Sequence, residues 1–140
     1  MKKFLFILLV LTSCSVTHKK FKSESPHFFA CNRWVDSNND GIYDFNEFEN
    51  IKSTFHSSET VLFVGFITSL PSGSKIRFRL YAPDGLLIHE FTEPTLFKGT
   101  LLHAEYSVME LISNKSTGVW DAVWDIEDEV VAETQVNLIN

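Results

Sequence analysis

The chain has 140 residues and a net charge of −6; 44% of its residues are hydrophobic and 21% are charged. This length suits one domain, and the composition excludes a disordered chain, a collagen-like chain and a protein with several membrane spans. The acidic balance argues against a nucleic-acid partner. Thirteen Phe and three Trp provide enough large side chains for a hydrophobic core.

Residues 1–13 are predicted to be a signal peptide. Lys2 and Lys3 precede eight apolar residues at positions 4–11. This run is too short to cross a bilayer as a helix, but it is typical of the apolar region of a secretory signal. A buried N-terminal strand is the alternative interpretation.

A lipid anchor is predicted directly after this run. The segment Leu11-Thr12-Ser13-Cys14 resembles the lipobox of bacterial lipoproteins. The resemblance implies cleavage before Cys14, diacylglycerol on its sulfur and acylation of the new N-terminus, so membrane lipid is one expected partner. Because Ser15 is not Asp, the resemblance favours the outer membrane, with the periplasmic or the surface side left open. Two or more acyl chains anchor a protein stably without spanning the bilayer.

Residues 14–25 are predicted to be a flexible tether between the anchor and the folded domain. Lys19, Lys20 and Lys22 make it basic, which suits a position beside anionic lipid, although a soluble spacer explains these residues equally well. If Cys14 carries lipid, Cys31 has no partner within the chain. We therefore expect no disulfide, and we expect Cys31 to be a small buried hydrophobic residue.

The strongest internal motif covers residues 36–47, with the sequence DSNNDGIYDFNE. It resembles the EF-hand calcium loop, in which oxygen ligands surround a sharp turn, here at Gly41. The resemblance implies Ca²⁺ as the cofactor, bound by Asp36, Asn38, Asp40, the Ile42 carbonyl, Asp44 and Glu47. Four carboxylates within twelve residues repel one another without a cation, which favours a metal site. An acidic turn without metal is the alternative.

A helix is predicted on each side of this loop, so that residues 26–56 form an EF-hand-like helix–loop–helix. Ser25-Pro26 is a favourable helix start, and Phe28, Cys31 and Val35 then share one helical stripe. Apolar residues also recur at helical spacing after the loop, at Phe45, Phe48, Ile51 and Phe55. Because only one loop is present, a lone structural site is favoured over a paired sensor or a dockerin, which needs two repeats.

Residues 58–140 are predicted to form a β module. Strands are expected at residues 60–68, 75–82, 86–92, 105–113, 118–126 and 130–139. The first of these is apolar on both faces, so we expect one face in the core and the other under the helix–loop–helix. In that arrangement both parts pack as one unit. The predicted fold is thus mainly β, an antiparallel sandwich with a short N-terminal helix–loop–helix, with a small β-barrel as the alternative.

The last two strands carry a family resemblance. Gly118-Val119-Trp120, followed by a turn and a closing strand, resembles the final hairpin of bacterial immunoglobulin-like modules. In an immunoglobulin-like sheet the strands 75–82 and 118–126 are neighbours. Outward-facing charges would then lie side by side on these strands, with Lys75, Arg77 and Arg79 on one and Asp121 and Asp125 on the other.

An enzyme is the least supported function. The five His residues are scattered without metal-ligand spacing, and no Gly-x-Ser-x-Gly elbow is present. The sequence therefore predicts an anchored cell-envelope lipoprotein in which a structural Ca²⁺ site supports a binding or interaction module with a protein or glycan partner. A structural accessory subunit of an envelope complex is the alternative function.

Overall fold

The computed structural model describes residues 27–41, 45–67, 73–94 and 100–140. The predicted signal peptide, the lipobox with Cys14, and the tether up to residue 25 lie outside these residues. Within the described ranges, no helix is long and apolar enough to cross a membrane.

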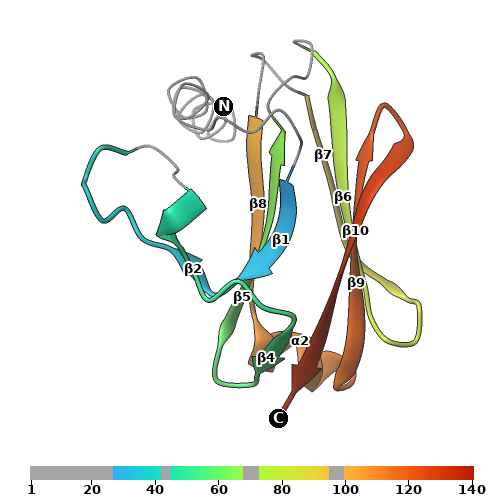
Figure 1. Cartoon of the computed structure of the whole chain (residues 1–140). Coiled ribbons are helices and arrows are strands. Elements are labelled where there is room, and N and C mark those ends of the chain that lie inside the picture. Colours follow the sequence, from blue (N-terminus) through green and yellow to red (C-terminus); the bar gives the residue numbers. More distant parts are fainter. Residues whose placement is uncertain (1–26, 42–44, 68–72, 95–99) are drawn as a thin grey trace, which may run out of the picture.

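Two β-sheets contain most of the described chain (Figure 1). The three-stranded sheet has the order β1 (His27–Cys31), β5 (Thr60–Ile67), β8 (Thr100–Ser107). The five-stranded sheet has the order β4 (Thr54–His56), β10 (Glu129–Ile139), β9 (Gly118–Ile126), β6 (Lys75–Tyr81), β7 (Leu87–Pro94). All neighbours are antiparallel except β4 and β10, which run parallel.

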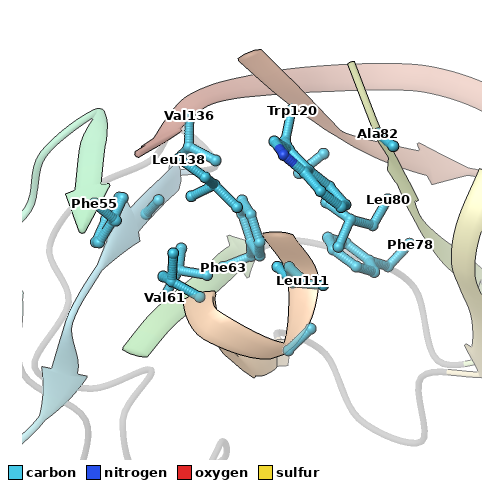
Figure 2. Close-up of a cluster of buried hydrophobic side chains, with 14 of the residues drawn as sticks. Phe55, Val61, Phe63, Phe78, Leu80, Ala82, Leu111, Trp120, Val136 and Leu138 are labelled. Carbon is cyan, nitrogen blue, oxygen red and sulfur yellow. The ribbon is translucent and has the colours of Figure 1, made fainter. Parts of the chain in front are cut away.

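One hydrophobic core joins the facing surfaces of the two sheets. It includes Phe63 from the three-stranded sheet and Phe78 and Trp120 from the five-stranded sheet (Figure 2). Trp124 of β9 also belongs to it, and all four side chains are fully buried. Gly65 lets Trp124 approach, since a Cβ there would lie 3.2 Å from ring atoms of both Trp124 and Phe28. Because the sheets share this core, the prediction of a mainly β, two-sheet sandwich is confirmed, and the barrel alternative is not what the structure shows.

The strands after residue 58 largely follow the sequence pattern. Alternation in β6 buries Ile76, Phe78 and Leu80, and the β9–β10 turn at Glu127 and Asp128 has positive φ at both residues, as a two-residue type I′ turn requires. In β10, strict alternation predicts that Val130 and Ala132 both point inward, but the register shifts between them, so Ala132 packs against the core and Val130 is exposed.

One predicted strand is partly wrong. Residues 105–113 were expected to be extended, but β8 ends at Ser107 and the helix α2 (Val108–Asn114) follows. Val108 and Leu111 are buried in the core from this helix, with Ile112 partly buried beside them. Their spacing of three and four residues is that of a helical face, which the strand interpretation overlooked.

The predicted helices around the acidic loop are also wrong. Residues 27–31 form β1, and the segment after the loop forms a single 3₁₀ turn, η1 (Phe45–Glu47), followed by short strands. The apolar residues of β1 alternate, with Ala30 in the sandwich core and Cys31 in a second cluster on the other side of the sheet. A short segment that is apolar on both faces fits a doubly covered strand as well as a helical stripe, and here the pairing with β5 decides between them.

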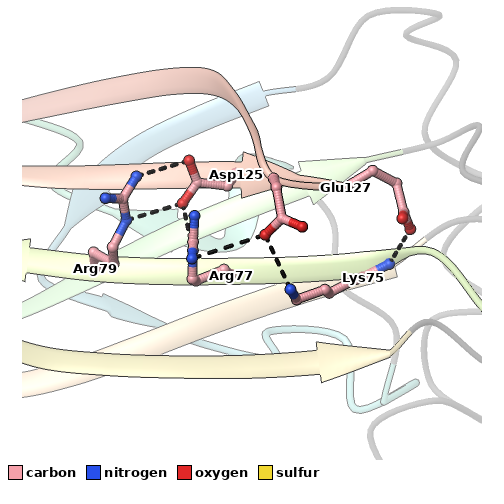
Figure 3. Close-up of polar contacts among 6 residues, drawn as sticks. Lys75, Arg77, Arg79, Asp125 and Glu127 are labelled. Carbon is pink, nitrogen blue, oxygen red and sulfur yellow. Dashed lines mark hydrogen bonds and ion pairs between the residues drawn. The ribbon is translucent and has the colours of Figure 1, made fainter.

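The prediction that β6 and β9 are neighbours is confirmed, and the predicted charge pairing is confirmed for Asp125 but not for Asp121. Arg77 lies directly opposite Asp125 in the ladder, and Tyr81 lies opposite Asp121. The Asp125 carboxylate accepts hydrogen bonds from Arg77 Nε at 2.9 Å and from Arg79 Nε and Nη2 at 2.9 and 2.8 Å (Figure 3). Asp125 is 1% exposed, because the two arginine side chains cover it.

We predict that Asp125→Asn lowers the free energy of unfolding by about 1–3 kcal/mol, because the two guanidinium groups then lose their charged acceptor. Asp121→Asn is the matched control, since Asp121 lies on the same strand and face but accepts an exposed bond from Gln135 Nε2. The control is expected to stay within about 0.5 kcal/mol of the wild type. Urea unfolding measures both variants, and equal losses would contradict the prediction.

Candidate metal-binding loop

The acidic loop belongs to an insertion, residues 32–53, that lies between β1 and β4. These two strands join opposite sheets, so the insertion occupies the point where the chain crosses from one sheet to the other. Inside it, β2 (Arg33–Trp34) pairs with β3 (Phe48–Glu49) as a short antiparallel ribbon. Val35 continues this ribbon, because its N–H donates to the Glu47 carbonyl at 2.9 Å. The ribbon thus brings the two ends of the loop together.

The insertion packs against the outer face of the three-stranded sheet (Figure 1). Phe48 of the ribbon forms a buried cluster with Cys31, Leu62 and Val64, which point away from the sandwich core. Phe29 extends this contact through edge-to-face packing on Phe48, with ring centroids 5.2 Å apart. The prediction that β5 is covered on both faces is therefore confirmed, although by a ribbon in place of two helices.

The first half of the loop is organised around Asp36. Its carboxylate accepts hydrogen bonds from the backbone N–H groups of Asp40 at 3.1 Å and Gly41 at 2.9 Å. Asn38 Oδ1 also accepts from the Asp40 N–H, at 3.0 Å. Gly41 has φ of +68°, so the predicted sharp turn is present where a side chain would strain the backbone. The backbone therefore curls around oxygen atoms in this half of the loop.

Glu47 closes the other end of the loop, and the ribbon holds its side chain. The residue is 6% exposed. Glu47 Oε1 accepts from the backbone N–H and the hydroxyl of Ser37, at 3.2 and 3.1 Å, and Oε2 accepts from Trp34 Nε1 at 3.2 Å. A carboxylate oxygen has about two acceptor positions, so Oε2 keeps capacity beyond the Trp34 bond, whereas the two Ser37 bonds occupy the positions of Oε1.

The predicted ligands carry the type of atom that calcium prefers, but in the described residues they do not surround a common point. All predicted side-chain ligands carry hard oxygens, which Ca²⁺ prefers. Two of the predicted ligands, Ile42 and Asp44, lie outside the described residues. Within the described ranges, no three His, Cys, Asp or Glu side chains are grouped closely enough to hold a metal ion. The structure therefore places Asp36, Asn38, Asp40 and Glu47 on one short loop without showing them around a common centre.

The sequence interpretation missed the residues that orient Glu47. Neither Trp34 nor Ser37 is among the predicted site residues, yet both donate hydrogen bonds to the Glu47 carboxylate. The indication available in the sequence is that a Trp, which needs a partner for its N–H when buried, lies two residues before the loop.

Cys31 behaves as expected from the sequence. It is a free, fully buried thiol in the outer cluster, and burial raises its pKa to about 12. Since the thiolate is the reactive form, the thiol stays protonated and unreactive at neutral pH.

Comparison with protein families and with curated proteins finds no match for this chain. Among solved structures, the CARDB domain of the PF1109 protein from Pyrococcus furiosus, crystallised with di-metal ions, is similar with a TM-score of 0.37 and 12% identity, over 84% of this chain and 97% of that chain. The alkylpurine DNA glycosylase AlkC from Pseudomonas fluorescens, bound to DNA with an abasic site analogue, has a TM-score of 0.39 and 10% identity. That similarity covers 95% of this chain and 36% of the glycosylase. Similarity at this level does not indicate a shared function.

We predict that Trp34→Phe lowers the free energy of unfolding by about 1–3 kcal/mol in the absence of calcium, because the buried Glu47 carboxylate loses one of its donors. A double-mutant cycle with Glu47→Gln should give a coupling energy of about 0.5–3 kcal/mol, as expected for residues in contact. Glu49→Gln, on the same ribbon with a side chain that is 42% exposed, is the control. Additive losses in urea unfolding would show that Trp34 and Glu47 do not interact.

Proposed function

We propose that this chain is a lipid-anchored protein of the bacterial cell envelope, in which an immunoglobulin-like β-sandwich serves as a binding or interaction module and the inserted loop holds one structural Ca²⁺. The lipobox resemblance at Leu11-Thr12-Ser13-Cys14 supports the anchor and the outer-membrane location. The Gly118-Val119-Trp120 hairpin and the β7-β6-β9-β10 neighbourhood support the immunoglobulin-like assignment.

The observation that carries the calcium assignment is the arrangement of the loop about its own oxygen atoms. Backbone N–H groups point at Asp36 from one half of the loop, while Glu47 is held at the other end next to Ser37. Asp36, Asn38, Asp40, the Ile42 carbonyl, Asp44 and Glu47 would together supply the oxygen ligands of a lone calcium site. Calcium would neutralise the repulsion among the four carboxylates, so its role is to stabilise the insertion.

A structural ion in this loop suits an envelope protein, because calcium outside the cytoplasm reaches millimolar levels. Sites in extracellular modules bind with dissociation constants of about 10⁻⁴–10⁻³ M. At calcium about tenfold above such a constant, linkage contributes about 1.4 kcal/mol of stability. The partner of the sandwich is proposed to be another envelope protein or a glycan.

We predict that 1 mM calcium raises the melting temperature of the purified protein by about 5 °C relative to a chelator, because the ion binds only the folded loop. Asp36→Ala and Glu47→Gln should each lose most of this rise. Differential scanning calorimetry with and without chelator measures the shift, and calorimetric titration detects binding directly. Identical melting of the wild type in both buffers, with no heat of binding, would leave the loop as an acidic turn without metal.

We predict that the mature protein begins at Cys14 and carries acyl chains there. Mass spectrometry of protein isolated from membranes should show the diacylglycerol and N-acyl mass on the N-terminal peptide. Cys14→Ser should accumulate as an uncleaved precursor without lipid, because the modified sulfur is missing. Normal cleavage and membrane retention of Cys14→Ser would disprove the anchor.

A further inference from the structure

Glu59, at the turn between β4 and β5, forms hydrogen bonds with several segments of the fold, some of them distant in sequence. The turn is closed locally, because the Glu59 N–H donates to the His56 carbonyl at 2.9 Å and the His56 N–H donates to Glu59 Oε2 at 2.7 Å. One carboxylate oxygen of Glu59 is thus used within the turn. The other oxygen, Oε1, points to the insertion.

Both ends of the insertion meet at this oxygen. Lys52 Nζ donates to Glu59 Oε1 at 2.5 Å, and Asn32 Nδ2 donates to the same oxygen at 3.3 Å. Asn32 Nδ2 also donates to the Thr60 carbonyl at 3.0 Å, which fixes the first residue of the insertion to the start of β5. The Lys52 ammonium lies 5.0 Å from the ring centre of Phe55, a core residue of β4. The hydrogen bond from Lys52 lowers the pKa of Glu59, so the carboxylate is charged at neutral pH.

The backbone of Glu59 extends this connection to the end of the neighbouring strand β8, where Thr60 pairs with Ser107. The Glu59 carbonyl accepts from the Val108 N–H at 3.1 Å, at the first residue of α2. Val108 is fully buried in the main core. Glu59 therefore connects both ends of the insertion, the β4–β5 turn and the start of α2.

We propose that Glu59 is the residue that couples the inserted loop to the sandwich, so that the insertion and the sandwich open together as one cooperative unit. Without this connection, the insertion would be held by its two-residue strands, by one small apolar cluster around Phe48 and by a few hydrogen bonds at its two ends. Segments with so few buried contacts ordinarily open on their own, at a lower free energy than the rest of the domain.

The coupling has a consequence for calcium that rests on the proposed function. An ion that stabilises the loop stabilises the sandwich only if the two parts open together. Loss of the coupling would confine the effect of the ion to the insertion, because the sandwich would then unfold independently of whether the loop is occupied.

Hydrogen exchange on the full chain tests the coupling without any metal. The bonded amides of Asn32, Val35 and Lys52 report on the insertion, and those of β9 and β10 report on the sandwich. In the wild type, both sets should exchange within about tenfold of each other, as expected for one cooperative unit. In Glu59→Gln, the insertion should exchange at least about tenfold faster than the sandwich, because the charged acceptor shared by Lys52 and Asn32 is lost.

Two further variants separate coupling from a general loss of stability. Lys52→Met keeps an unbranched apolar side chain and removes the ammonium group that lies over Phe55, so it should reproduce the effect of Glu59→Gln. The double variant should add little to either. Glu49→Gln removes the exposed pair with Arg33 in the same insertion and should leave the ratio of the two exchange rates unchanged. Equal acceleration of both regions in Glu59→Gln, or a wild-type insertion that already exchanges about a hundredfold faster than the sandwich, would overturn the proposal.

Repeating the exchange experiment with calcium distinguishes failure of this inference from failure of the proposed function. If calorimetric titration of the wild type with calcium chloride shows binding, calcium should slow exchange in both regions of the wild type and only in the insertion of Glu59→Gln. Slowing confined to the wild-type insertion would refute the coupling while the calcium site stands. If the wild type shows no heat of binding, the calcium assignment fails, and the metal-free exchange rates alone decide the role of Glu59.

Discussion

β5 must be covered on both of its faces, and the arrangement of the N-terminal half follows from this requirement. Val61 and Phe63 point into the sandwich core, while Leu62 and Val64 point outward and would otherwise meet water. Burying these outward side chains is favourable by roughly 1.5–3 kcal/mol for each large one. The insertion supplies the cover through Phe48, and in doing so it brings the acidic loop to the outer side of the three-stranded sheet.

The loop is held in a way that differs from the helices implied by its resemblance to an EF-hand. A short β-ribbon brings Val35 and Glu47 together, so the two ends of the loop are adjacent without any helix on either side. Trp34 then orients the Glu47 carboxylate from within the same ribbon. Strand pairing thus brings the loop ends together, and the Trp34 indole N–H orients the Glu47 carboxylate. The ribbon in turn depends on the burial of Phe48.

Charged groups have two different roles in the molecule. Asp125 is buried beneath Arg77 and Arg79, where paired hydrogen bonds compensate for its removal from water. The Arg33–Glu49 pair on the ribbon is exposed, with side chains that are 68% and 42% accessible, and it contributes little. Glu59 lies between these cases, since it is partly buried and shared by segments that are distant in sequence. Its importance comes from the number of segments it joins more than from the strength of one ion pair.

Local patterns in the sequence were sufficient for most of the strands that follow residue 58, although they extended one strand into the residues that form α2. Alternating side chains in β6 and β9 define which face is buried, and the charges left on the other face indicated which strands are neighbours. The oxygen-rich loop and the turn at Gly41 were also evident, because each depends on residue types at fixed spacing.

The tertiary structure alone decided the conformation around that loop. Phe55 suits a helical stripe by spacing, but it lies in β4 because it pairs with Leu138, near the opposite end of the chain. β1 likewise forms because β5 offers it a partner, and α2 forms because the core accepts Val108 and Leu111 from one helical face. Short apolar segments satisfy both helical and strand periodicity, so the choice depends on partners that are distant in sequence, and local spacing does not encode them.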